Sequence, residues 1–144
     1  MAVTVKRISL WRKELANRPG TLAETLDPVA KAGADLQVVM GYCYPGDRTK
    51  AAVELFPVTT KKASAAAQGA GLAAASIPAL HVEGDNRAGL GHAITSALAD
   101  AGVNLDFLVA HVIGRKFSAV FGFENEVDAQ KASAVIKKAC AQKK

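Results

Sequence analysis

The chain has 144 residues, of which 50% are hydrophobic and 22% charged, and its formal net charge is +5. This composition is typical of a folded globular protein, and it excludes a disordered or fibrous chain and, since no apolar run reaches the roughly 18–20 residues of a spanning helix, an integral membrane protein. Two cysteines, Cys43 and Cys140, are too few for a disulfide framework and lie in no metal-binding motif. Because the cysteines lie in no such motif, we expect no metal or cofactor. Because the amino end also lacks a signal-like apolar segment, we expect a cytoplasmic protein.

The first half of the chain predicts, in order, a strand, a helix, two strands, a short helix and a weak edge strand. The first helix carries an apolar stripe that begins at Leu22, has Asn17 as its expected N-cap and stops at Gly33, with a kink expected at Pro28. The strands and the short helix are expected at Val3–Arg12, Leu36–Tyr44, Ala51–Val58, Lys61–Gln68 and, for the weak edge strand, Gly69–Ser76.

The second half predicts the same order of elements. A strand, a helix stripe closed by Gly102, two strands and a last helix are expected at Ala79–Glu83, Leu90–Ala101, Asn104–Ile113, Lys116–Phe123 and Asp128–Lys138. Both halves therefore read β-α-β-β-α, with a fourth strand supplied by the weak segment or by the neighbouring half. This is the α+β, ferredoxin-like βαββαβ plan.

The two halves are copies of one unit. Asn17-Arg18-Pro19-Gly20 returns as Asn86-Arg87-Ala88-Gly89, and Lys62-Ala63-Ser64-Ala65 returns as Lys131-Ala132-Ser133-Ala134, both at a spacing of 69 residues. A single spacing shared by separated segments indicates a tandem duplication. We predict two domains, 1–75 and 76–144, which pack together because a unit of about 70 residues buries only a marginal core alone.

The repeated Asn-Arg-x-Gly loop is the candidate binding site. A tight turn that enters a helix leaves the first backbone N–H groups without intrahelical partners, and the positive helix end then favours a carboxylate. Glycine lets a ligand approach the backbone closely, and an asparagine amide can donate or accept a hydrogen bond. The predicted ligand-binding residues of the two loops are Asn17, Gly20, Thr21, Leu22, Asn86, Gly89, Leu90 and Gly91.

The sequence resembles a tandem of two ACT domains, most closely the small stand-alone bacterial proteins of this family. The resemblance rests on residues 17–36, which run from the Asn-Arg-Pro-Gly-Thr-Leu loop to Ala-Gly-Ala-Asp-Leu, and on residues 86–105, which repeat the pattern. It implies a pair of βαββαβ units that bind a small amino acid, regulate amino-acid metabolism and pair their sheets, here in a homodimer. The enzyme or regulator that would respond to the ligand is not identified by the sequence.

The resemblance also implies ligand contacts at the start of the second strand of each unit, where Asp35 and Asn104 lie. A carboxylate accepts from an ammonium group better than a neutral amide, and Pro19 holds the first loop in place where the second loop has Ala88. We therefore expect the first repeat to be the stronger amino-acid site, with its loop facing the second strand of a packed neighbour.

Two other interpretations remain open. An RNA-binding module shares the ferredoxin-like plan, and Arg115 and Phe117 fit part of its aromatic motif, although the alternating Phe117, Phe121 and Phe123 are also what a buried sheet face requires. A ligand-free module that pairs through its sheets is the second. Catalysis is not expected, because the histidines and cysteines share no motif spacing.

Overall fold

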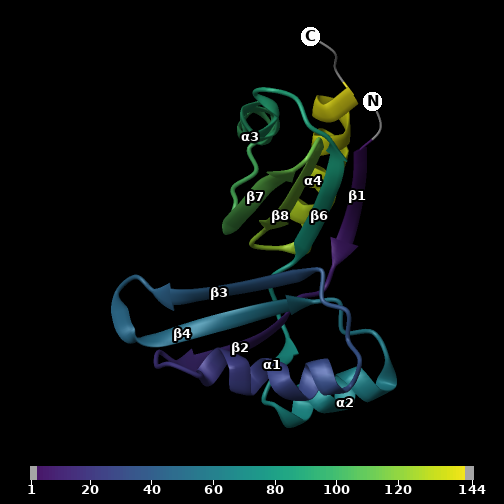
Figure 1. Cartoon of the computed structure of the whole chain (residues 1–144). Coiled ribbons are helices and arrows are strands. Elements are labelled where there is room, and N and C mark those ends of the chain that lie inside the picture. The colour runs from purple at the N-terminus through teal and green to yellow at the C-terminus, as the bar shows by residue number, and fades with distance from the viewer. Residues whose placement is uncertain (1–2, 142–144) are drawn as a thin grey trace. The chain divides into compact units, whose positions relative to one another are not determined.

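The computed structural model describes residues 3–141 and contains two four-stranded antiparallel sheets (Figure 1). The chain divides into two compact units. We call Ser9–Ser76 the inserted unit, and we call the unit that joins residues 3–8 to residues 77–141 the split unit. Each has one sheet and two helices. The inserted unit has the chain order βαββαβ, and the split unit has the same plan with its edge strand supplied by residues 3–8, which confirms the predicted α+β, ferredoxin-like fold.

The inserted unit follows the predicted order closely. Its sheet has the strand order β3-β4-β2-β5. The weak edge strand is two residues long, and the first helix continues past Pro28 to Lys31. The elements are β2 (Trp11–Ala16), α1 (Thr21–Lys31), β3 (Val38–Tyr44), β4 (Asp47–Phe56), α2 (Lys61–Gly69) and β5 (Ala73–Ala74).

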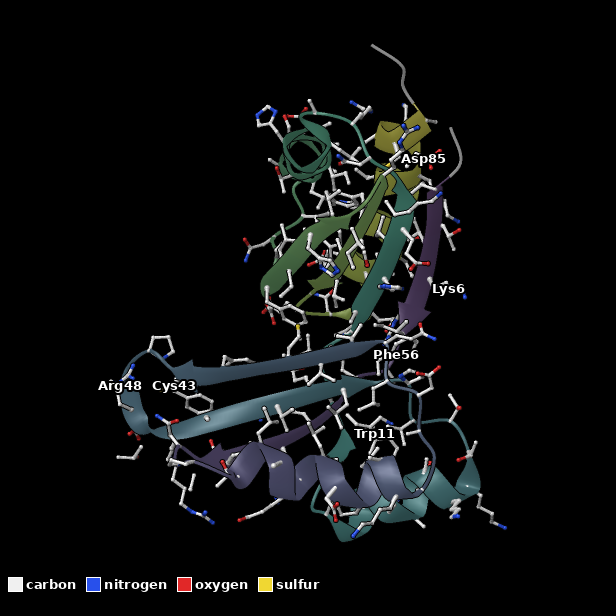
Figure 2. All side chains as sticks on the ribbon, in the orientation of Figure 1. Lys6, Trp11, Cys43, Arg48, Phe56 and Asp85 are labelled. Carbon is white, nitrogen blue, oxygen red and sulfur yellow. The ribbon has the colours of Figure 1, made fainter. Side chains whose placement is uncertain are left out.

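The core of the inserted unit lies between its sheet and its helices. Strand residues alternate between the two faces, so Leu15, Val53 and Leu55 point to the helices and are buried. Val29 of α1 and the alanines of α2 cover them, and Trp11 packs against the same cluster (Figure 2). The small alanine side chains let α2 lie close to the sheet.

The split unit repeats this plan with a strand borrowed from the start of the chain. Its sheet has the order β1-β6-β8-β7, so β1 takes the place that β5 has in the other unit. The elements are β1 (Val3–Ile8), β6 (Ala79–Asp85), α3 (Leu90–Asp100), β7 (Phe107–Ile113), β8 (Lys116–Gly122) and α4 (Glu126–Ala141).

The strand expected at Val3–Arg12 is wrong as a single element. It is two strands in two sheets, β1 and β2, joined through Ser9 and Leu10. β1 pairs with β6 from Val3 opposite Gly84 to Ile8 opposite Ala79. The compact units therefore differ from the predicted ranges 1–75 and 76–144, because this pairing joins residues 3–8 to the second half of the chain.

The phenylalanine face of β8 belongs to the core. Phe117 and Phe121, together with Phe123 just beyond the strand, are buried and cluster with Ile94 of α3 and Ile136 of α4. An RNA-binding module would need such rings open for base stacking, so this burial argues against that alternative.

Within residues 3–141, no helix is long and apolar enough to cross a membrane.

Candidate functional site

Both loops enter their helices through a glycine in the left-handed region. Gly20 has φ of 94° ahead of α1, and Gly89 has φ of 81° ahead of α3. This backbone strongly favours glycine, which explains why the residue recurs in both repeats. Neither helix has a side-chain cap, so the expectation that Asn17 caps the first helix is wrong.

Asn17 instead ties the first loop to the β3–β4 hairpin. Its backbone N–H donates to the carbonyl of Thr49 at 2.9 Å, and its Nδ2 donates to the carbonyl of Arg48 at 2.7 Å. Nδ2 also lies 3.3 Å from Cys43 Sγ, and Figure 2 labels Cys43 and Arg48 at this end of the sheet. The side-chain amide is thus engaged within the fold, and the Oδ1 atom is what Asn17 can offer a ligand.

The second loop is anchored in the same way. The backbone N–H of Asn86 donates to the carbonyl of Arg115 at 2.8 Å, in the turn between β7 and β8. Arg87 reaches across to α4, where its Nη2 donates to the carbonyl of Ala139 at 3.4 Å. Each loop is therefore held against the hairpin of its own unit.

The backbone amides that remain at the helix starts follow from the hydrogen bonds of the loops. In α1, the Thr21 N–H donates back to the carbonyl of Arg18 and the Glu24 N–H to that of Gly20, at 3.4 and 2.9 Å. The amides of Leu22 and Ala23 are then the first-turn donors that the helix cannot pair.

In α3 the same pattern uses the amides of Leu90 and Ala93, which leaves those of Gly91 and His92. Of the predicted donors, Leu22 and Gly91 therefore keep an amide that no carbonyl of their own helix can pair, whereas the amides of Thr21 and Leu90 are engaged within their loops. The position of the His92 amide was not anticipated from the sequence.

Asp35 and Asn104 do not open strands. Both lie in the loops that follow α1 and α3, and β3 and β7 begin later, at Val38 and Phe107. An 11-residue helix separates each of them from the loop of its own unit, which is a distance of about 16 Å along the axis. The structure therefore does not bring Asp35 to Asn17, or Asn104 to Asn86, within one unit.

Charged groups surround the first loop. Arg18 Nη2 lies 3.5 Å from Glu24 Oε1, with both side chains exposed. At the hairpin, Thr49 donates to Asp47 Oδ1 through its hydroxyl and its backbone N–H, which lowers the pKa of the Asp47 carboxyl. The anionic groups beside the loop are thus already paired, Glu24 with Arg18 and Asp47 with Thr49.

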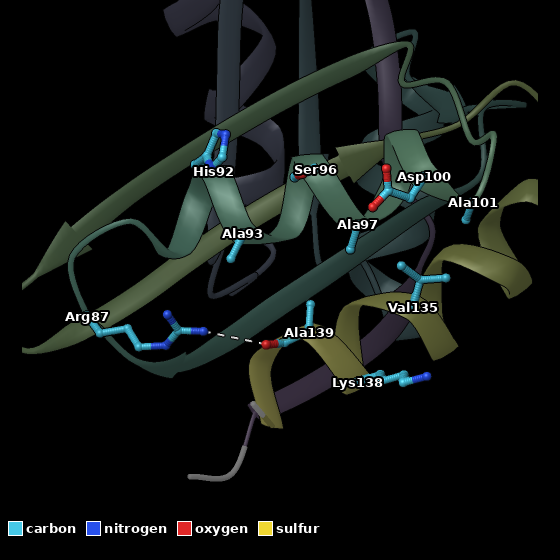
Figure 3. Close-up of a pocket in the computed structure, with 10 residues that line it drawn as sticks. All are labelled: Arg87, His92, Ala93, Ser96, Ala97, Asp100, Ala101, Val135, Lys138 and Ala139. Carbon is cyan, nitrogen blue, oxygen red and sulfur yellow. Dashed lines mark hydrogen bonds between the residues drawn. The ribbon is translucent and has the colours of Figure 1, made fainter. Parts of the chain in front are cut away.

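Two hollows lie near the loops. A groove of about 590 Å³ runs between α3 and α4 and begins at Arg87 (Figure 3). A smaller cavity of about 190 Å³ lies beside the first loop. The groove is lined by Arg87, His92, Ala93, Ser96, Ala97, Asp100, Ala101, Val135, Lys138 and Ala139.

A polar cluster on the sheet of the inserted unit was not anticipated from the sequence. Tyr42 donates to Glu54 Oε2 at 2.7 Å, and Arg12 Nη2 donates to the hydroxyl of Tyr44 at 2.6 Å. Glu54 is only 2% exposed, and its Oε1 has no hydrogen-bond partner among the described residues. The sequence shows that Tyr42 and Tyr44 alternate along one strand. It does not show the register that places Glu54 beside them.

No metal site emerges from the part of the chain that the structure describes: no three His, Cys, Asp or Glu side chains in residues 3–141 come together.

Comparison with solved structures identifies the fold. A protein of Bacteroides thetaiotaomicron superposes with a TM-score of 0.75 at 17% identity, covering 93% of this chain and 89% of that one. The ligand-free regulatory subunit of aspartate kinase from Thermus thermophilus gives 0.63 at 16%, covering 96% and 97%. The corresponding subunit from Thermus flavus gives 0.59 at 16%, covering 97% of each chain.

A scan of protein-family models gives no match to the sequence, and a search of curated proteins gives none either. At identities this low, structural similarity shows the fold alone. The chain therefore has an ACT-like fold of two ferredoxin-like units, like the regulatory subunits of aspartate kinase.

Proposed function

We propose that this protein is a regulatory sensor that binds a free amino acid and carries out no catalysis itself. The observation that carries the proposal is the repeated helix entry, in which Gly20 and Gly89 hold the left-handed backbone and no side chain caps the helix. Such an uncapped helix start binds a carboxylate through backbone N–H groups and the helix dipole. The similar regulatory subunits of aspartate kinase support a regulatory role.

The ammonium group of the ligand needs an acceptor from outside the unit. β3 and β7 are the edge strands that lie beside the two loops. If an edge strand of a second copy pairs antiparallel with such an edge, the start of the added strand lies next to the hairpin to which the loop is bonded. Asp35 of the partner subunit would then face the first loop in a pairing of β3 with β3.

A thermal-shift screen of the twenty amino acids tests the proposal. A ligand that binds only the folded state stabilises it by RT ln(1 + [L]/Kd), about 2.7 kcal/mol at a hundredfold excess over Kd. We expect one amino acid, or a few related ones, to raise the midpoint of unfolding. If all twenty leave it unchanged at millimolar concentration, the proposal is wrong and a ligand-free dimerisation module is favoured.

Asp35→Ala tests which residue accepts the ammonium. A hydrogen bond to a charged group contributes roughly 1.5–3 kcal/mol, so the variant should bind about tenfold or more weakly. Asn104→Ala, the matched change in the second repeat, should have a smaller effect because it removes no charge. Calorimetric titration of both variants measures this difference. If the Asp35 variant keeps full affinity for the amino acid, our assignment of the site is wrong, although the sensor function stands.

A further inference from the structure

The strand β2 is only partly covered on one side. β5 pairs with it at Trp11 and Arg12 alone. In the split unit, β1 covers the corresponding edge of β6 over six residues, from Ala79 to Gly84. On the side away from β4, Lys13–Ala16 therefore has no strand partner among the described residues. This open stretch of β2 is a free sheet edge inside the inserted unit.

The direction of the backbone groups identifies which of them are free. Asn17 N–H donates toward β4, at Thr49, whereas the carbonyl of Leu10 accepts from Ala75 on the β5 side. Because these directions alternate along a strand, Glu14 and Ala16 turn their N–H and C=O groups to the open side.

One of these open-side groups is already used. The Ala16 carbonyl accepts from the N–H of Arg18 and from the hydroxyl of Thr21, both at 3.0 Å. The N–H and C=O of Glu14 and the N–H of Ala16 remain. They form a donor, an acceptor and a second donor about 6.8 Å further along the strand.

A cavity adjoins this edge. It has a volume of about 190 Å³ and lies between β2 and the first turns of α1. Its innermost side chains are Leu15 and Thr25, which are 8% and 2% exposed. Lys13 does not close it, because its Nζ is held by the carbonyl of Ala70 at 2.8 Å. The full lining is Lys13, Glu14, Leu15, Ala16, Arg18, Thr21, Glu24 and Thr25.

We propose that this edge binds a short extended peptide segment by strand addition. The N–H and C=O of one residue, Glu14, are matched by the main chain of another peptide, which pairs both groups at once. A side chain of the added strand that stands on the helix side enters the cavity against Leu15 and Thr25. The cavity holds only about 190 Å³ and its innermost side chains are an aliphatic and a hydroxyl-bearing one, so the side chain of the segment at that position is small and either aliphatic or hydroxyl-bearing. This site is separate from the proposed amino-acid site and does not depend on it.

The probe is acetyl-Ala-Val-Thr-Val-Ala-amide, whose three central residues copy Val3–Val5, the segment that covers the corresponding edge of β6. We would titrate it to millimolar concentration into the ¹⁵N-labelled full chain and follow the amide resonances by NMR. The amides of Glu14 and Ala16 should shift in a saturable way and exchange more slowly with solvent. Those of Lys13 and Leu15, which already face β4, should change little.

The matched control is acetyl-Ala-Val-Pro-Val-Ala-amide, in which the central N–H is missing. It should bind roughly tenfold more weakly, or more weakly still, because one main-chain hydrogen bond is lost. The proposal is overturned if the first peptide gives no saturable shift, if both peptides bind equally, or if the shifts lie away from β2. It is also overturned if the Glu14 and Ala16 amides are already protected, in a concentration-dependent way, before peptide is added, because a second copy would then occupy the edge.

Discussion

Tyr42 is the residue whose hydrogen bond we expect to matter most for stability. Its hydroxyl donates to one oxygen of the buried Glu54 carboxylate, and the other oxygen has no partner among the described residues. Tyr42→Phe removes this donor and leaves the buried carboxylate without the hydrogen bond. An unsatisfied buried polar group costs roughly 1–3 kcal/mol, so we expect a loss of that size in urea unfolding at pH 7.

Tyr44→Phe is the control for this change. It also removes one hydroxyl, from a ring that stacks on Tyr42 with centroids 6.3 Å apart. Its partner is the guanidinium of Arg12, which is only half-buried and which water can solvate. The control should therefore lose less stability, and equal losses in the two variants would contradict our account of Glu54.

The pH dependence provides a second readout. Burial, followed by the hydrogen bond to Glu54, raises the pKa of Tyr42 above 10.0. A raised pKa in the folded state means that the stability contributed by the protonated Tyr42 hydroxyl is complete below the pKa of the unfolded chain. That stability is lost as pH rises through the pKa of the folded state. Stability should fall more steeply above pH 10 in the natural protein than in Tyr42→Phe.

At the scale of elements, β1 is the strand whose removal should affect one unit and spare the other. Deleting residues 1–8 uncovers the edge of β6 and removes Val3 and Val5, which pack against the core of the split unit. We expect that unit to lose at least about 2 kcal/mol, since two partly buried valines are lost. Hydrogen exchange should show faster exchange in β6 and β8, with β3 and β4 unaffected. Ala74→Pro is the control, because it changes β5, the strand that has the corresponding place in the inserted unit. Faster exchange in β3 and β4 after the deletion would contradict the assignment of β1.

The order of elements could be predicted from the sequence because the repeat reports it twice. Stripes such as Leu22–Val29, closed by Gly33, are local signals, and each helix and hairpin is found near its expected place. Sheet membership is not local. The pattern from Val3 to Arg12 gives no sign that β1 pairs with Ala79–Gly84, more than seventy residues away.

The candidate site was predictable to the same extent. Gly20 and Gly89 carry a local requirement for a left-handed backbone, and the structure has them there. The role of Asn17 depends on where the hairpin carbonyl of Arg48 lies, and the open edge at Glu14 depends on how short β5 is. Both are consequences of tertiary pairing, so neither could be read from the sequence.

For the whole molecule, the edge strand β7 is the surface that we most expect to pair with another chain. It contains no Asp, Glu, Lys or Arg, and most of its residues are exposed, up to 70% at Ile113. Its register with β8 is regular throughout. The other edge, β3, contains Gly41 and has an irregularity at Cys43 and Tyr44, features that weaken pairing at an edge, so we expect β3 to pair only when a bound ligand also joins the two copies.

The sequence of β7 fits a second copy of itself. An antiparallel pairing centred on Ala110 places Leu108 opposite Val112 of the partner subunit, and Val109 opposite His111 of the partner subunit. No like charges meet in this register, and the contact is the same on both copies, so an assembly paired in this way would close as a dimer. Asp106 N–H donates to Gly122, so the odd-numbered residues of β7 turn their backbone groups outward, as this register requires.

Val109→Lys tests this interface by light scattering. Val109 is 43% exposed, so a lysine should be accepted by the isolated chain, but in the dimer it would bring two charges into the paired strands. We expect the natural protein to be a dimer and Val109→Lys to be a monomer at the same concentration. Val39→Lys on β3, where the valine is 46% exposed, is the matched control and should remain a dimer when no amino acid is bound. If the natural protein is a monomer at all working concentrations, the dimer is wrong but the fold is not. If Val39→Lys alone dissociates the dimer, the interface lies at β3, because the two variants match in exposure and side chain and differ only in the edge.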